Sequence, residues 1–195
     1  RTRGMANRTR KKIIMDQQHL KNWRETYAMA KPYITKNTIG IDVGCREGGF
    51  SAQMEDDFKH VFAFDFRDKR KEFSRNVKDN RKFTYTVCGI GERVGHSFTS
   101  SDRVGRIKDR GNIKVPIKTI DSFEYDNVGF IKYDIEGYEL RAIKGSEKTI
   151  KKYFPVIIVE QNKGNIDCVE LLQKWGYELK GIDDMFKSDY LRVKA

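Results

Sequence analysis

The sequence predicts an α/β protein with one doubly wound, mostly parallel sheet that ends in an antiparallel hairpin. Short uninterrupted apolar runs, such as those at 60–65 and 155–160, are typical of parallel strands covered on both faces. Stretches with helical periodicity lie between these runs, and this alternation is typical of strand–helix–strand units. Several runs end on an acid, at the sheet edge where such folds bind ligands. With 195 residues, the chain is long enough for one such domain and too short for two.

The first predicted helix, at 16–31, is capped by Asp16 and stopped by Pro32. The expected elements after it are a strand at 39–43, a helix at 50–58, a strand at 60–65, a helix at 68–80, a strand at 83–88, an ordered stretch at 115–121, a strand at 128–134, a helix at 139–153, a strand at 155–160, a helix at 165–175 and a hairpin at 177–182 and 189–193. Residues 92–114 are rich in glycine and charge, and we expect either a short hairpin with a loop or a substrate lid there. We assign residues 16–195 to a single domain.

The chain carries a formal net charge of +11, and residues 1–12 contribute six basic groups and no acid. We expect residues 1–15 to form a basic, disordered arm, of which residues 1–4, before Met5, are non-native. A basic balance favours polyanionic partners such as nucleic acid or anionic glycans. A solvated tail on a mildly basic enzyme explains the charge equally well.

The spacing of the cysteines and histidines argues against a metal site, and the length of the apolar runs argues against a membrane span. Three widely spaced cysteines and three histidines form no metal-ligand pattern, so we expect no metal site. Free thiols in a reducing cytoplasm are the expected state, with a disulfide as the alternative. No apolar run approaches the length of a membrane span, and we predict a cytoplasmic protein.

Residues 39–51 are the most informative stretch, because a β-branched run leads through a glycine-rich turn into a helix. This arrangement brings backbone N–H groups up to a polar or anionic cofactor. A dinucleotide fingerprint, G-x-G-x-x-G, is broken by Arg46, and Asp42 would repel a diphosphate. An acid beside the loop suits the ammonium group of S-adenosylmethionine; a dinucleotide and a purely structural turn are the alternatives. Asp65, 23 residues after Asp42, is placed to accept hydrogen bonds from ribose hydroxyls.

A second motif makes this interpretation more specific. Residues 131–140 read Ile-Lys-Tyr-Asp-Ile-Glu-Gly-Tyr-Glu-Leu, followed by Ile-Lys-Gly at 143–145. This pattern resembles the K-x-D-x-E-G-x-E signature, followed by a helix with K-G, of the FkbM-type methyltransferase family. Residues 42–48 are similar to its D-V-G-A-N-x-G, Thr-Ile-Asp at 119–121 resembles its T-L-D, and 155–160 resembles the strand after its signature. Arg46 replaces the family's usual asparagine, and Phe66 stands where the family commonly has glutamate and proline.

The resemblance covers about residues 38–162 and implies a Rossmann-like class I methyltransferase sheet. It also implies S-adenosylmethionine as cofactor and methyl transfer to a hydroxyl, which we expect on a small molecule or glycan. The expected cofactor-binding residues are Asp42, Gly44, Cys45, Arg46, Gly48, Asp65, Phe66, Cys88 and Gly89. We read Cys45 as a small residue that fits the turn, not as a nucleophile.

Asp134 is the predicted catalytic base, or orients the acceptor, since it ends the strand that faces the transferred methyl. Glu136 and Glu160 are the next catalytic candidates, with helix capping or binding of backbone N–H groups as their alternative role. The predicted substrate-binding residues are Lys132, His96, Arg103 and Arg106. A structural strand position for the lysine, an incidental histidine and a solvated loop for the arginines are the alternatives.

The alternative function is methylation of RNA at a ribose or the cap, with the basic arm and residues 93–114 holding the nucleic acid. Ribose-methylating enzymes commonly use a Lys-Asp-Lys-Glu set. Residues in that order are Lys36, Asp134, Lys144 and Glu160. The match is poor because Glu160 ends the strand on which such enzymes place the second lysine. A non-catalytic binding protein is a third class, which the intact acids disfavour.

Overall fold

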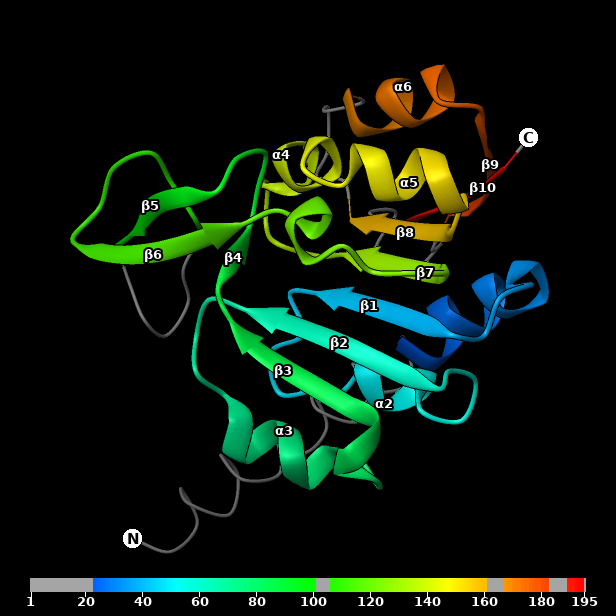
Figure 1. The fold of residues 1–195 in the computed structure, drawn as a ribbon, viewed down its shortest axis with the longest axis horizontal. Coiled ribbons are helices and arrows are strands. Elements are labelled where there is room, and N and C mark those ends of the chain that lie inside the picture. The colour runs from blue at the N-terminus through cyan, green and yellow to red at the C-terminus, as the bar shows by residue number, and fades with distance from the viewer. Residues whose placement is uncertain (1–22, 101–105, 161–166, 183–188, 195) are drawn as a thin grey trace, which may run out of the picture.

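The computed structural model describes residues 23–100, 106–160, 167–182 and 189–194. Its main sheet has seven strands in the order β3-β2-β1-β7-β8-β10-β9 (Figure 1). Their bounds are β1 Ile39–Val43, β2 His60–Asp65, β3 Phe83–Val87, β7 Val128–Tyr133, β8 Val156–Glu160, β9 Tyr177–Ile182 and β10 Asp189–Lys194. The first five strands in the spatial order pair in parallel, and β10 is antiparallel to β8 and β9. The predicted mostly parallel sheet with a C-terminal antiparallel hairpin is confirmed.

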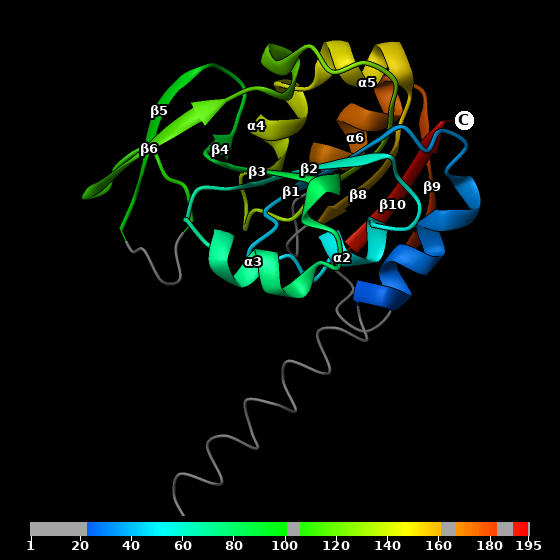
Figure 2. The ribbon, with the colours of Figure 1, turned by 60° about the horizontal axis from the view of Figure 1, so that its bottom comes forward.

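Helices cover both faces of this sheet. On one face lie α4 (Glu139–Lys144), α5 (Glu147–Tyr153) and α6 (Asp167–Lys174). On the other lie α2 (Ser51–Met54), α3 (Arg70–Asn76) and the helical residues 23–30, as Figure 2 shows from a second direction. Side chains alternate along each strand, so β7 contributes Ile131 to the core under α4 and α5, and Phe130 to the core with Phe50 of the opposite layer.

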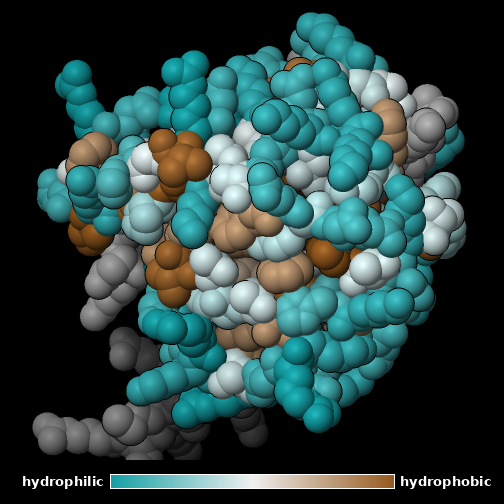
Figure 3. Space-filling model, in the orientation of Figure 1, coloured by the Kyte–Doolittle hydropathy of each residue, from teal (hydrophilic) through white to brown (hydrophobic). Residues whose placement is uncertain are grey.

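A second, three-stranded sheet has the order β4-β6-β5. Its strands are β4 Gly89–Ile90, β5 Gly95–Thr99 and β6 Ile113–Lys118. It projects beyond the carboxyl ends of β1 and β2 (Figure 1). Of the two structures expected for residues 92–114, the hairpin is present, because β5 pairs antiparallel with β6. Figure 3 shows a largely hydrophilic face with apolar side chains gathered around this second sheet and the adjoining strand ends.

Three predicted helices have different bounds in the structure, and two of these differences have an identifiable reason. The helix predicted at 139–153 is broken into α4 and α5, because the Asp121 carboxylate accepts the backbone N–H groups of Lys148 (3.0 Å) and Thr149 (2.9 Å) and so caps a new helix start. The helix predicted at 68–80 ends at Asn76, because the N–H groups of the next turn are taken by the Glu55 carboxylate instead of a helical carbonyl. The helix predicted at 50–58 is likewise limited to α2.

The N-terminal helix passes into a 3-10 turn, Lys31–Tyr33, at the position where Pro32 was expected to stop it. Its predicted start at Asp16 and the basic arm at 1–15 lie outside the described residues. Cys45, Cys88 and Cys168 are buried free thiols, as predicted. Within the described residues, no helix is long and apolar enough to cross a bilayer.

Candidate active site

A cavity of about 350 Å³ opens at the carboxyl ends of β1, β2 and β7, beside the second sheet. This volume lies in the range of small-molecule sites, about 300–1,000 Å³. The predicted residues that line it are Gly44, Arg46, Asp65, Phe66, Cys88, Gly89, Arg106, Asp134 and Glu136. Lining residues that were not predicted include Arg67, Ile107 and Lys108. Segments far apart in sequence are therefore brought to one place.

The glycine loop is held tightly against the end of β7. Gly44 has a φ of +88°, and a Cβ added there would lie 1.9 Å from the carbonyl oxygen of Asp134. Only glycine fits this close approach. Arg46 also has a positive φ, +48°, which is uncommon for a long side chain. Gly48, with a φ of +83°, leaves room for the Phe73 ring, so it shapes the loop and does not line the cavity.

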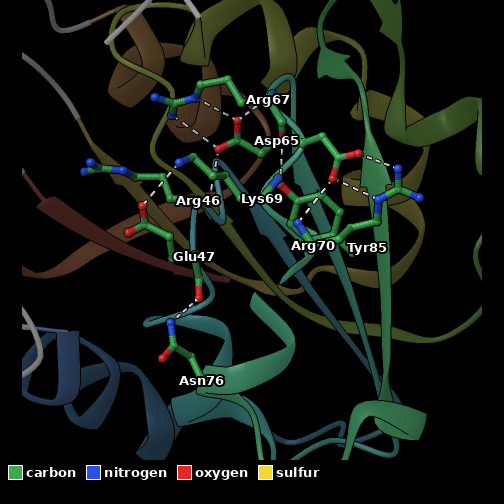
Figure 4. Close-up of polar contacts among 9 residues, drawn as sticks. Arg46, Glu47, Asp65, Arg67, Lys69, Arg70, Asn76 and Tyr85 are labelled. Carbon is green, nitrogen blue, oxygen red and sulfur yellow. Dashed lines mark hydrogen bonds and ion pairs between the residues drawn. The ribbon is translucent and has the colours of Figure 1, made fainter. Parts of the chain in front are cut away.

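Asp65, at the end of β2, is the polar centre of one half of the cavity. Its two oxygens accept the backbone N–H groups of Arg46 (3.0 Å) and Arg67 (2.9 Å). The Arg67 Nε–H adds a third bond of 3.1 Å, and Figure 4 shows the Arg67 side chain reaching this carboxylate. Asp65 thus bonds to both neighbouring turns and is 4% exposed.

An apolar wall stands beside Asp65. Ile107 is buried between the two sheets with Val115 and Ile117, and Phe66 packs against this cluster. The Cys88 thiol lines the same region, and burial raises its pKa to about 11, so it is neutral at pH 7. A flat, apolar group such as a nucleobase fits a surface of this kind.

The opposite half of the cavity is acidic. Asp134 follows β7, and its Oδ2 accepts a 2.8 Å hydrogen bond from the buried Lys132 ammonium. Carboxylate oxygens of Asp134, Glu136 and Glu160 lie within 4.8 Å of one another. The sequence indicated acids at these strand ends but not this convergence.

The three acids differ in their protonation. Burial, followed by the charge of Asp134, raises the pKa of Glu160 to about 8. Burial also acts to raise the pKa of Asp134, but the charge and hydrogen bond of Lys132, with a hydrogen bond from Glu160, outweigh it and hold that pKa below its usual range. At pH 7, Glu160 is therefore mostly protonated beside an ionised Asp134.

The turn after Asp134 is held by Glu139, a residue that was not singled out from the sequence. Its carboxylate accepts the N–H groups of Ile135 (2.8 Å) and Gly137 (2.8 Å). The capping role considered for Glu136 thus belongs to Glu139. Glu136 instead has a φ of +59° and pairs with Arg106 at 3.4 Å across the cavity rim. Glu139 is the first residue of α4, and an acid in the first turn of a helix is the sequence signal for such a role.

The model of the methyltransferase FkbM domain matches residues 11–179. The chain belongs to the FkbM methyltransferase family. It is accordingly an S-adenosylmethionine-dependent methyltransferase, which confirms the resemblance seen in the sequence.

Solved structures agree on the fold of this FkbM-family chain. An FkbM methyltransferase from Methylobacillus flagellatus KT is 20% identical, with a TM-score of 0.58, over 81% of this chain and 43% of that one. An rRNA methylase from Streptococcus thermophilus is 9% identical, with a TM-score of 0.53, over 86% of this chain and 92% of that one. A SAM-bound magnesium protoporphyrin IX methyltransferase from Synechocystis PCC 6803 is 13% identical, with a TM-score of 0.51, over 93% and 81%.

The chain spans less than half the length of the Methylobacillus protein. A search of curated protein sequences finds no match.

Several predicted site residues of this FkbM-family protein do not line the cavity. Asp42 is fully buried beneath the glycine loop, where it accepts a 2.6 Å hydrogen bond from Ser51, so the geometry does not offer the direct cofactor contact that was expected. Cys45 is buried, and burial raises the pKa of its thiol, in keeping with a small packing residue. Lys132 is 3% exposed and reaches Asp134 rather than the cavity surface.

The remaining predicted residues differ in their placement. His96 is exposed on β5 and is not part of the cavity wall. Glu160 borders the cavity only through its proximity to Asp134 and Glu136. Arg103 lies outside the described residues.

Proposed function

We propose that this methyltransferase transfers the methyl group of S-adenosylmethionine to a hydroxyl oxygen of a small molecule or a glycan. The observation that carries the proposal is the Asp134 carboxylate at the acidic end of the cavity, where a 2.8 Å hydrogen bond from Lys132 helps to hold its pKa below its usual range. An alcohol loses its proton as it attacks, so it needs a base within hydrogen-bond reach. Asp134 is 29% exposed, which leaves it accessible to an acceptor.

The residues that line the cavity are consistent with one half for the cofactor and an acidic half for the methyl acceptor. Asp65 would accept hydrogen bonds from the ribose hydroxyls, and the N–H groups of the loop at 44–48 would face the carboxylate of the cofactor. Phe66, Cys88 and Gly89, with Ile107, would enclose the adenine. The cofactor supplies a methyl group already activated by its sulfonium.

The protein groups then have two tasks. They align the acceptor oxygen with the methyl carbon, and Asp134 removes the hydroxyl proton. A lone pair of the acceptor oxygen forms the new O–C bond while the C–S bond breaks and its electron pair stays on sulfur. The hydroxyl proton passes to Asp134, so charge and atoms balance. Glu136 and Glu160 would act through Asp134. Glu136 would help to position its carboxylate, and Glu160 would share a proton with it.

RNA is the second candidate acceptor, and basic side chains at the cavity favour it. Arg46, Arg106 and Lys108 line the cavity and are exposed, and the chain as a whole carries a net charge of +11. Arg106 is engaged with Glu136, however, and the sequence has no aromatic run suited to base stacking. We also propose that the protein is cytoplasmic, because its three cysteines are free thiols, as is usual in a reducing compartment.

A methyl-transfer assay with methyl-labelled cofactor tests the proposal directly. Separate pools of glycans, small hydroxylated molecules and RNA serve as acceptors. Label in a glycan or small molecule, as an acid- and base-stable ether, is the expected result. Label in RNA alone, with affinity that falls steeply with salt, would replace the proposal by the second candidate. Label on nitrogen or carbon would contradict both.

A further inference from the structure

Lys132 is a buried cation placed between two carboxylates. It is the register partner of Asp42 on the neighbouring strand β1, and it precedes Asp134, the residue just after its own strand β7, by two positions. Its Nζ lies 2.8 Å from Asp134 Oδ2 and 3.7 Å from Asp42 Oδ1, and it lies over the Phe50 ring at 4.9 Å. The side chain is 3% exposed, so water does little to screen these charges.

The lysine does not satisfy both acids at once. Asp42 Oδ1 is buried and lacks a hydrogen-bond partner, although Oδ2 of the same carboxylate is bonded to Ser51. An orphaned buried carboxylate oxygen is costly, and native proteins seldom retain one without a reason. A shift of about 1 Å by the ammonium would bring it within hydrogen-bond length of this oxygen.

We propose that Lys132 is a two-position counter-ion, which holds Asp134 ionised before the reaction and moves to Asp42 as Asp134 takes up the acceptor's proton. The inference rests on the proposed role of Asp134 as the base. Protonation of Asp134 removes the charge that holds the ammonium, while Asp42 still offers a vacant oxygen. The buried lysine therefore keeps a counter-ion throughout, which lowers the cost of moving a proton into this region. Lys132 is a positioning residue and does not touch the acceptor.

Other charged groups also face Asp134 and enter the same balance. They are Arg46 from the glycine loop, Glu160 from β8, and Glu136 and Glu139 from the turn and helix that follow. Burial is the largest influence on Asp42 and raises its pKa, while Asp134 is held below its usual range. This difference between the two pKa values agrees with the position of Lys132, whose Nζ lies nearer to Asp134 than to Asp42.

Carbon-13 NMR titration of the aspartate carboxyl groups tests the inference without any acceptor, with the Asp134 signal assigned from Asp134→Asn. Lys132→Met should raise the pKa of Asp134 by about 1 unit or more, because an opposite charge is lost. Asp42→Asn should lower it, because a like charge is lost and the lysine stays with Asp134. Lys132→Arg, which keeps the charge, should leave the pKa near the wild-type value. Opposite shifts would show that both side chains are coupled to Asp134 through their charges, which a lysine with a packing role alone would not produce.

The inference is overturned if Asp42→Asn leaves the pKa of Asp134 unchanged or raises it. If Lys132→Met does not fold, the double variant Asp42→Asn with Lys132→Met replaces it, and its Asp134 pKa should exceed that of Asp42→Asn alone. The pH profile of kcat is then measured with an acceptor from the pool assay. Its acid limb should move in the same direction as the Asp134 pKa measured by NMR, up in Lys132→Met and down in Asp42→Asn. Opposed NMR shifts with an unmoved acid limb would overturn the base role and the lysine's movement in turnover, while the charge coupling would stand.

Discussion

Arg67 lies across the carboxylate of Asp65 and the ring of Phe66. Its Nε donates a 3.1 Å hydrogen bond to Asp65 Oδ1 (Figure 4). Its guanidinium carbon lies 5.0 Å from the centre of the Phe66 ring. These are the two surfaces proposed for the ribose and the adenine. On this proposal, Arg67 would compete with the cofactor for Asp65 and would move when the ribose binds.

This competition predicts opposite effects of two substitutions on cofactor affinity. Asp65→Ala should weaken binding of S-adenosylmethionine about tenfold or more, because charge-assisted hydrogen bonds to the ribose are lost. Arg67→Ala should bind the cofactor more tightly than the wild type. Isothermal titration calorimetry measures both. Equal weakening in the two variants would mean that Arg67 holds the cofactor instead of competing with it.

The close contact between the glycine loop and Asp134 predicts that Gly44→Ala abolishes cofactor binding and destabilises the fold by several kcal/mol, on the order of 3. Gly176 is a matched control, because its φ of +87° is nearly the same and no atom lies within 4 Å of an added Cβ. Gly176→Ala should cost only about 1–2 kcal/mol, for the left-handed backbone alone. Chemical denaturation measures both, and equal costs would exclude a role for the contact with Asp134.

Removal of the turn's cap should loosen the site. Glu139→Ala leaves the N–H groups of Ile135 and Gly137 without their acceptor, at a cost of about 2–3 kcal/mol in the free energy of unfolding. Glu147→Ala, at the exposed start of α5, is the control and should cost no more than about 0.5 kcal/mol. A Glu139→Ala protein as stable as the control would show that the cap contributes nothing.

The protonated Glu160 predicts a pH dependence of stability. Its folded pKa, about 8, exceeds its ordinary value of 4.5, so the folded state binds more protons between these values. Stability should fall as pH rises from about 5 to 8, by about 2 kcal/mol since solvent partly screens the carboxyl. Glu160→Gln should remove most of this fall. Urea unfolding at pH 5 and pH 8 measures it, and an equal fall in the variant would assign the proton elsewhere.

The fold and one half of the site could be predicted because they depend on position along a strand. Asp65 and Asp134 follow apolar runs, and parallel strands bring their carboxyl ends to one edge, so both acids line the cavity. Asp42 precedes the strand end by one residue and therefore points to the layer below, where Ser51 and Lys132 meet it. The alternation of side chains along a strand therefore indicates a buried Asp42. Its position beside the glycine loop had instead suggested contact with the cofactor.

Residues placed by the second sheet could not be predicted in the same way. Ile107 is an isolated apolar residue in a charged segment, and only the packing of β6 against it makes it part of the wall. Arg67 gave no signal, because its role depends on the local turn after β2. His96 lies on the solvent side of β5, which alternation along a strand decides and a loop prediction does not.

The proposed base is tested most directly by Asp134→Asn, measured for cofactor affinity by calorimetry and for turnover with an acceptor from the pool assay. We expect a cofactor Kd within about threefold of the wild type and a kcat lower by about 10²–10⁴, the usual contribution of a general base. Asp56→Asn, at an acid 77% exposed and outside the cavity, is the control and should retain full turnover. A kcat for Asp134→Asn equal to that of the control would contradict the central claim.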